Sequence, residues 1–248
     1  MRVALFATCL VDGLFPDIGK ATVRLLRRLG HEVVVPMSQT CCGQLLINTG
    51  YPREALPLIR NHVQTFLDYD VIVVPSGSCT ASIRHQHETT AQEIGDVQLA
   101  EAAKVVGRHT FELSEFLLDV LEVTDVGAYF PHRVTYHPAC HGLRALKLGE
   151  RPLQLLRAVR GIDLITLPDA QSCCGFGGTF ALKNPDVSTA MLADKMSAVL
   201  DTGAEICTAN DASCLMHIGG GLSRLNTGVR TMHLAEILAA TDDVPDGR

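Results

Sequence analysis

The cysteines are the residues of this chain whose spacing points most directly to chemistry. Eight of the nine fall into two sets with one order. A single cysteine comes first, two adjacent cysteines and a glycine follow about 30 residues later, and a fourth cysteine lies about 35 residues further on. The sets are Cys9, Cys41, Cys42 and Cys79, and Cys140, Cys173, Cys174 and Cys214. Four thiolates around one point suit Zn²⁺ or an iron–sulfur cluster, so the spacing predicts two such sites.

Each adjacent cysteine pair is followed by a glycine, Gly43 in "QTCCGQ" and Gly175 in "QSCCGF". Neighbouring side chains of an extended strand point to opposite faces, so both sulfurs can serve one site only if the backbone turns sharply. Glycine permits such a turn. In the second corner, Gly177 and Gly178 leave further room for backbone N–H groups to approach a bulky ligand and to donate hydrogen bonds to its sulfur atoms.

Three explanations of these cysteines stay open at this point. In the first, each half of the chain holds four buried cysteines that bind nothing. In the second, the four cysteines bind a structural zinc ion, and in the third they bind an iron–sulfur cluster. Paired C-x-x-C knuckles, which are typical of zinc ribbons, are absent. No single cysteine stands apart as a nucleophile, which disfavours a cysteine hydrolase. The ninth cysteine, Cys207 in the apolar run "EICTA", is expected to be a small core residue.

The whole chain repeats itself, not only its cysteines. Gly30 and Gly161, and Pro36 and Pro168, correspond at nearly the offset that separates the two corners. We therefore expect a first cysteine-rich repeat over residues 1–126, a second over 127–240 and a disordered tail over 241–248. The first repeat carries an insertion between about residues 82 and 107, which is polar at first and then helical in pattern.

Short apolar runs alternate with helical periodicity in both repeats. The runs are "RVALFA", "EVVVP" and "VIVVP", then "RVTYHP", "DLITLP" and "EICTA". Helices are expected over 18–29, 53–67, 152–159 and 186–200, and amphipathic helices are expected to end each repeat. This pattern predicts an α/β fold of two tandem strand–helix repeats with parallel sheets, related by a pseudo-twofold axis. Each cysteine follows a strand, so the four should meet at the carboxyl edge of one sheet.

Several polar residues near the corners have two possible roles. His141 either donates a hydrogen bond to a cluster sulfur and carries a proton, or is an ordinary loop histidine. Arg144, Lys147 and Lys183 either offset cluster charge or are solvated. His137 is expected to fix its loop. Asn48 and Asn184 are expected to cap helices, and His85 and His87 to lie in a solvated loop.

The composition excludes some classes of protein. The net charge is −6, and no basic stripe is present, which argues against nucleic-acid binding. No run approaches the roughly 18 apolar residues of a membrane span, and the apolar N-terminus ends too soon for a signal peptide. We therefore expect a cytoplasmic protein, in which clustered cysteines more often serve metal or redox chemistry than disulfides. No phosphate-cradling glycine loop follows the first strand, which disfavours a self-contained nicotinamide or flavin dehydrogenase.

The segments "CCGQLLINTGY", "PSGSC", "YHPAC", "CCGFGGTF", "ALKNPDVS" and "DASCLMHI" carry a family resemblance. They resemble the Cys-Cys-Gly domains of heterodisulfide reductase and of the glycolate oxidase iron–sulfur subunit. The chain is more closely similar to the lactate utilisation protein A family of iron–sulfur oxidoreductases. The resemblance implies an electron-transfer component of a cytoplasmic L-lactate oxidation complex, with a ferredoxin-type iron–sulfur subunit and a third subunit as partners. It implies that the eight cysteines of the two sets are the cluster ligands.

One position departs from the wider domain pattern, which ends in Cys-x-x-Cys. Ser76 and Asp211 stand where that pattern has its additional cysteine. Their oxygens are weaker iron ligands than thiolate, and the four remaining thiolates per site are enough for an ordinary [4Fe–4S] cluster. One or two such clusters are therefore expected. The alternative is zinc, in a scaffold subunit of the same complex without a redox role. Another 2-hydroxy acid, such as glycolate, stays open as the substrate.

Overall fold

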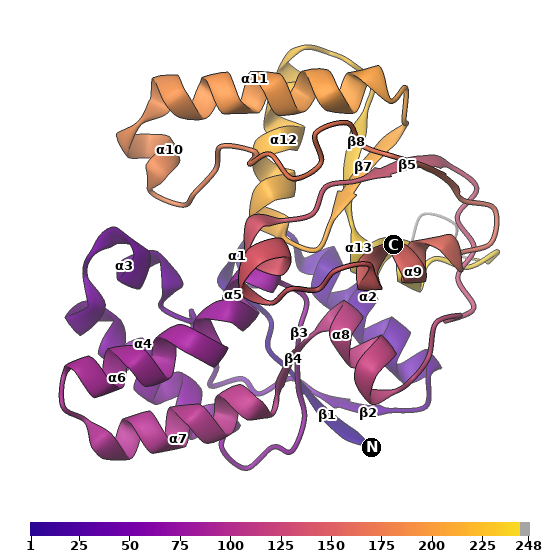
Figure 1. Cartoon of the computed structure of the whole chain (residues 1–248). Helices are drawn as coiled ribbons and strands as arrows, with labels where there is room; N and C mark the ends of the chain where they lie inside the picture. The colour runs from indigo at the N-terminus through magenta and orange to yellow at the C-terminus, as the bar shows by residue number, and fades with distance from the viewer. Residues whose placement is uncertain (244–248) are drawn as a thin grey trace. The chain divides into compact units, whose positions relative to one another are not determined.

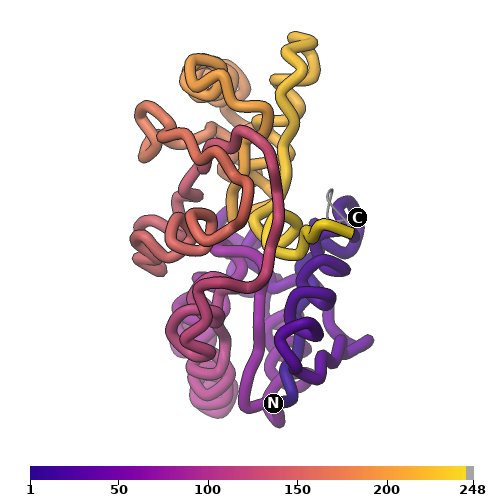
Figure 2. Tube along the Cα trace, turned by 90° about the vertical axis from the view of Figure 1, so that its right-hand side faces the viewer, coloured from indigo at the N-terminus to yellow at the C-terminus, as the bar shows by residue number. Residues whose placement is uncertain are grey.

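The structure is a computed structural model that describes residues 1–243. It divides into two compact units, Met1–Leu121 and the chain from Glu122 onwards, which we call the first and second unit. The colours of Figures 1 and 2 show that each unit is one continuous stretch of sequence. The repeat limits 1–126 and 127–240 stay predictions of the sequence. Of the expected tail, residues 244–248 lie outside the described residues, whereas Asp242 forms a salt bridge with Arg160.

The first unit is built on a four-stranded parallel sheet with the order β2-β1-β3-β4. Its strands are β1 (Arg2–Leu5), β2 (Glu32–Val34), β3 (Ile72–Val74) and β4 (Thr110–Glu112). Its longer helices are α2 (Pro16–Arg28), α4 (Pro52–Phe66), α6 (His87–Glu93) and α7 (Val97–Arg108). In Figure 1, α2 lies on one side of this sheet, and α4, α6 and α7 lie on the other. The sheet is covered on both faces, as its continuous apolar strands require.

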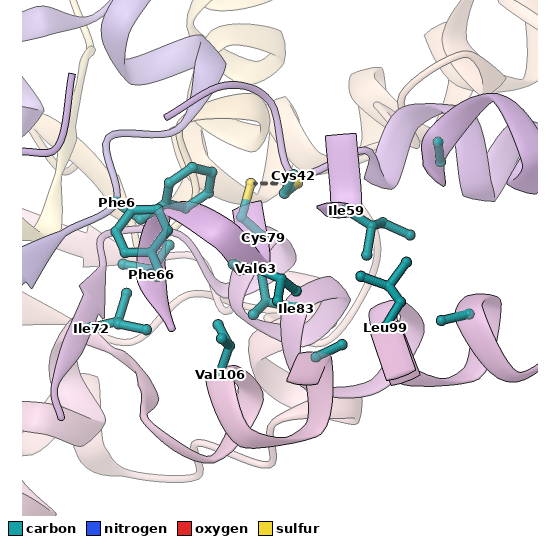
Figure 3. Packing of buried hydrophobic residues seen from close by; sticks show 14 of the residues in the cluster. Phe6, Cys42, Ile59, Val63, Phe66, Ile72, Cys79, Ile83, Leu99 and Val106 are labelled. Atoms are coloured by element: carbon teal, nitrogen blue, oxygen red, sulfur yellow. Dashed lines mark hydrogen bonds between the residues drawn. The ribbon is translucent and has the colours of Figure 1, made fainter. Parts of the chain in front are cut away.

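Short helices follow the carboxyl ends of the strands in the first unit. They are α1 (Cys9–Gly13), α3 (Gln44–Thr49), α5 (Gly77–Ala81) and α8 (Leu113–Glu115), with π-helical turns at Ser82–Gln86 and Phe116–Val120. The core beneath them packs α4 and α7 against the sheet through residues such as Phe6, Ile59, Phe66, Ile83 and Val106 (Figure 3). The cysteine-bearing turns therefore rest on a closely packed apolar floor.

The second unit repeats this architecture with the strand order β6-β5-β7-β8, again all parallel. Its strands are β5 (Arg133–Tyr136), β6 (Asp163–Ile165), β7 (Ile206–Ala209) and β8 (Arg230–His233). Its helices are α9 (Arg151–Arg157), α10 (Phe180–Lys183), α11 (Pro185–Asp201), α12 (Ala212–Arg224) and α13 (Leu234–Ala239), with a π-helical turn at His141–Ala145. The expected fold class, tandem α/β repeats with parallel sheets, is confirmed.

Each unit has a fourth strand that the sequence did not predict. The amphipathic segments 111–121 and 232–240 were expected to be helical, but β4 and β8 include their first two residues and extend the sheets. A run of three or four residues that leads directly into a helix has too little period-two alternation to stand out. The change of structure occurs at Glu112 and His233, whose side chains cap the helices that follow.

The insertion of the first repeat is also more helical than expected. The interpretation of His85 and His87 as members of a solvated loop is wrong, because both lie in helical turns. His85 is exposed, whereas His87 is completely buried. Within residues 1–243, no helix combines the length and apolar character that are needed to cross a membrane.

Glu112 is a fully buried carboxylate at the carboxyl end of β4. Its Oε2 accepts hydrogen bonds from the Ser114 hydroxyl and from the backbone N–H groups of Ser114 and Glu115. Its Oε1 has no hydrogen-bond partner among the described residues. Burial raises the pKa of Glu112 from 4.5 to about 7, although the Ser114 hydrogen bonds partly oppose the rise. Protonation of Glu112 therefore favours the folded state.

This raised pKa predicts a pH-dependent stability. Between pH 4.5 and 7 the folded state retains a proton that the unfolded state releases, so the free energy of unfolding should fall as the pH rises. The fall should reach about 3 kcal/mol for this group. Anaerobic urea denaturation at several pH values checks this, with Glu112→Gln as the comparison. The substituted protein should lose that part of the dependence, and parallel curves for the two proteins would contradict the assignment.

Candidate metal centres

Three strand ends carry the four cysteines of the first unit. Cys9 opens α1, directly after β1, and Thr8 caps this turn by accepting a hydrogen bond from the Val11 N–H. Cys41 and Cys42 lie in the turn between β2 and α3. Cys79 lies in α5, after β3, where its own N–H donates to the Ser76 hydroxyl at 3.3 Å. Because β1, β2 and β3 are parallel neighbours, their carboxyl ends bring these turns to one edge.

The sulfurs of the first unit form a continuous chain of contacts. The Cys42 and Cys79 sulfurs are 3.4 Å apart, and Figure 3 shows them facing one another above the apolar core. The Cys41 sulfur receives hydrogen bonds from the Cys42 and Cys9 thiols and from the Gly43 N–H, which is 3.4 Å away. We call this set of four cysteines the first site.

The second unit brings its four cysteines together in the same way. The Cys173 sulfur receives hydrogen bonds from the Cys140 and Cys174 thiols and from the Gly175 N–H at 3.3 Å. The Cys174 thiol in turn contacts that of Cys214, which lies in the first turn of α12. We call this set the second site. All eight sequence-predicted cysteines thus fall into two groups, each at one sheet edge.

The thiol contacts divide the protons unequally within each site. Hydrogen bonds from Cys42 and then Cys9 lower the pKa of the Cys41 thiol, whereas the hydrogen bond to Cys41 raises the pKa of both partners. Four sulfurs this close cannot all ionise without a cation among them, because each thiolate repels the next. A bound cation removes this obstacle, and thiolates are the ligands that zinc and iron–sulfur clusters take. The donor set therefore fits a metal centre.

The cysteines of each site differ in exposure. Cys42 and Cys174 are buried in the core, at 2% and 1% exposure, and Cys79 and Cys214 are nearly so. The remaining cysteines are more accessible, since Cys9 is exposed and Cys41, Cys140 and Cys173 are half-buried. Each site therefore extends from the apolar interior to the surface of its unit.

The glycine of each corner has the left-handed backbone that the turn requires. The φ angle is +83° at Gly43 and +90° at Gly175. The two corners differ in crowding, because a Cβ atom at Gly175 would lie 2.5 Å from the Ser188 carbonyl oxygen of α11. At Gly43 the nearest atom would be the Ala55 Cβ, at 3.4 Å. The second corner therefore packs tightly against α11, an arrangement that we call the clamp. The Ser188 hydroxyl also donates a hydrogen bond to the Gly175 carbonyl at 2.8 Å.

The two positions that depart from the wider cysteine pattern lie at helix starts. Ser76 is the N-cap of α5, and its hydroxyl accepts from the Cys79 N–H. Asp211 is the N-cap residue of α12, and its carboxylate accepts from the Ser213 hydroxyl at 2.9 Å. Both residues therefore position the helical turn that carries the fourth cysteine.

Other residues singled out in the sequence are less closely tied to the sites. His141 is half-buried in the π-helical turn after Cys140, and its role towards a cluster stays a prediction. Arg144 donates to the Gln171 carbonyl, two residues before Cys173. Lys147 and Lys183 are exposed.

The capping roles expected for Asn48 and Asn184 are wrong. Asn48 lies inside α3, where its side chain accepts a hydrogen bond from Gln86 at 2.7 Å. Asn184 occupies the N-cap position of α11, but its side chain makes no capping hydrogen bond. Proline at the first position of α11 sets the helical backbone there without a side-chain cap.

Three buried histidines lie near the sites, of which the sequence singled out His87 and His137 but not His62. The His87 Nε2 lies 2.7 Å from the Cys42 carbonyl oxygen, and the His62 ring packs edge-on against Phe6 and His87. In the second unit, one ring nitrogen of His137 and the sulfurs of Cys174 and Cys214 all lie within 4.8 Å of one another. The only sequence signal for His137 was its place directly after a strand, which also suits a loop histidine.

Comparison with known proteins agrees with this duplicated geometry. A family model described as "Cysteine-rich domain" matches residues 3–84 and 134–219, and each match contains one complete set of four cysteines. The chain is 44% identical to lactate utilization protein A of Geobacillus thermodenitrificans over 96% of this chain and 98% of the relative. It belongs to the lactate utilization protein A family.

A further member of this family, from an Exiguobacterium species, is 46% identical over 96% of each chain. Similarity to solved structures is weak. A glutamate racemase from Bacillus anthracis aligns with 96% of this chain and 78% of its own at 10% identity and a TM-score of 0.34. The lactate utilization protein A family, rather than this structural likeness, is therefore the frame for the sites.

The crowding at the two corners predicts unequal effects of substitution. Gly43→Ala should destabilise the protein by about 1–2 kcal/mol, the usual cost of a left-handed backbone with a side chain. Gly175→Ala should cost about 1–3 kcal/mol more, because the Ser188 backbone must move. Urea denaturation measures both. Gly220→Ala, on the exposed face of α12 with no atom within 4 Å, is the control and should not destabilise. Equal losses at Gly43 and Gly175 would contradict the clamp.

Proposed function

We propose that this protein is the iron–sulfur electron-transfer component of a complex that oxidises L-lactate or a closely related 2-hydroxy acid. The observation that carries the proposal is the convergence of four cysteine sulfurs at the sheet edge of each unit. The names of the relatives, which are lactate utilization proteins, support the choice of substrate. The eight cysteines of the two sites are the proposed ligands.

The folds of the units favour a redox centre over structural zinc. Structural zinc ions stabilise small domains that lack sufficient core. Here each unit has a four-stranded sheet with buried clusters beneath it. A metal is therefore not needed to hold the chain together. A scaffold protein with zinc at these sites stays the alternative.

When bound, an iron–sulfur cluster accepts and releases single electrons. The chain's own groups would hold it and tune it. The Gly43 and Gly175 N–H groups donate to the sulfurs of Cys41 and Cys173, which stabilises negative charge there. The buried Cys42 and Cys174 exclude water from the inner side of each site. The accessible Cys9 and Cys140 leave a short path to a partner at the surface.

The oxidation of lactate itself needs groups beyond these sites. It removes two electrons and two protons from the substrate, whereas the cysteine sites offer one-electron chemistry. We infer that substrate oxidation occurs in a partner protein, and that the partners are a ferredoxin-type iron–sulfur protein and a third component. We expect the complex to work in the cytoplasm.

Metal analysis of anaerobically purified protein tests the iron–sulfur assignment. We expect iron and acid-labile sulfide, with absorption near 400 nm that bleaches on reduction. Cys42→Ser and Cys174→Ser should each remove the cluster of one site and lower the iron content by about half. Cys207→Ala is the matched control, because Cys207 is buried in β7 outside both sites, and it should keep full iron. Stoichiometric zinc without iron, even after anaerobic reconstitution, would contradict the proposal.

Reduction by substrate tests the physiological role. In the complex purified from its native host, L-lactate should bleach the iron absorption of this protein, and glycolate tests how closely the substrate is defined. Cys174→Ser in the same complex should lose the bleaching that belongs to the second site. If neither acid bleaches a fully loaded complex, electron transfer from 2-hydroxy acids is excluded.

A further inference from the structure

The two sites have the same cysteines but different surroundings. Lys195 in α11 and His62 in α4 occupy corresponding positions, the same number of residues after the proline that opens each helix. Lys195 is completely buried, and its Nζ donates to the carbonyl oxygens of Asp169 at 3.0 Å and Ala170 at 3.4 Å. These carbonyls belong to the loop that leads into the second corner. An ammonium group is thus anchored beside the second site.

The Lys195 Nζ lies among hydrogen-bond acceptors. Burial lowers the pKa of Lys195, and the nearby Cys207, Cys174 and Asp169 side chains partly oppose this change. The group has only donors, and both of its hydrogen bonds go to carbonyl oxygens. The corresponding His62 is buried among aromatic rings, and burial holds its pKa well below the usual value, so it is uncharged.

A second difference lies directly after the first strand of each sheet. This position is His137 in the second unit and Phe6 in the first. Neither ring nitrogen of His137 has a hydrogen-bond partner among the described residues, and one lies within 4.8 Å of the Cys174 and Cys214 sulfurs. Phe6 offers no polar atom, and Figure 3 shows its ring beside Phe66. Only the second site therefore has a buried imidazole within reach of its sulfurs from this position.

A third difference lies on the surface beside the first cysteine of each set. Arg144 lies four residues after Cys140, and the corresponding residue four positions after Cys9 is Gly13. The hydrogen bond to Cys173 and burial raise the pKa of Cys140, and the Arg144 charge partly opposes this rise; Arg144 also donates to the Gln171 carbonyl. The first site has the exposed carboxylate of Asp12 in this turn instead of a cation. Lys195 and Arg144 add positive charge around the second site, and His137 adds a buried polar ring, whose pKa burial lowers to about 4, where the first site has Phe6.

We propose that the two centres are not equivalent, and that the second has the higher reduction potential because Lys195, His137 and Arg144 stabilise its additional electron. This inference rests on the proposed iron–sulfur function. Nearby positive charge and hydrogen bonds to sulfur both raise the potential of such a cluster. The second centre is therefore reduced before the first, and the first centre, once reduced, is the stronger reductant.

A redox titration of the full-length protein tests this inference. The anaerobically loaded protein is titrated with dithionite and followed by electron paramagnetic resonance. Wild type should show two reduction steps. The step at the higher potential, which we call the upper step, belongs to the second centre, and the lower step belongs to the first. Lys195→Met should lower the reduction potential of the upper step by about 59 mV, which is a tenfold weaker electron affinity, and should leave the potential of the lower step unchanged. His137→Phe, which copies the first unit, should also lower the upper step only.

Two exposed positions give a reciprocal test that does not depend on changing the core. Arg144→Gln should lower the upper step slightly, since solvent screens this charge. Gly13→Arg has free space, with no atom within 4 Å of its Cβ position, and it adds the missing cation to the first unit. It should raise the lower step and so narrow the gap between the two.

Three results would overturn the inference. One is a single potential shared by both centres, another is a shift of the lower step in Lys195→Met, and the third is unchanged potentials in all four variants. If Lys195→Met fails to load iron, the exposed variants decide. Iron and sulfide in the wild-type protein are measured on the same samples. Their absence would refute the iron–sulfur function itself, whereas full iron with equal potentials would refute only the inequality of the centres.

Discussion

The approach of four sulfur atoms at the carboxyl edge of a parallel sheet is the interaction on which each unit depends. It is made possible by strand order, because the first strand lies between the second and third and so brings three loops together. It also needs a left-handed glycine, since only this turn lets adjacent cysteines face one ligand. The thiols share protons instead of ionising together, which is the condition that a bound cation relieves.

The duplication retains this geometry while the surroundings diverge. Strand order, corner glycines and cysteine positions are the same in both units. What differs is the layer around the sulfurs, where Lys195 and His137 stand in place of His62 and Phe6. The corner is also held differently, because α11 presses on Gly175 more closely than α4 does on Gly43. One design thus gives two electrostatic environments in a single chain.

Much of the site was predictable from sequence, and the reasons for the rest are physical. The cysteines and their glycines were predictable because metal ligation and left-handed turns restrict residue type strongly. The strands β4 and β8 were missed, since they are short and merge into capped helices. The burial of His87 and His137 was missed too, because each depends on contacts with chain segments far away in the sequence. No local pattern reports such contacts.

The packing beneath each sulfur set has a consequence for the life of the protein in the cell. Each unit has its own sheet and buried core, so under the function proposed above the chain would fold first and receive its inorganic part afterwards. Under the iron–sulfur function proposed above, loss of a cluster would then empty a site without unfolding the unit around it.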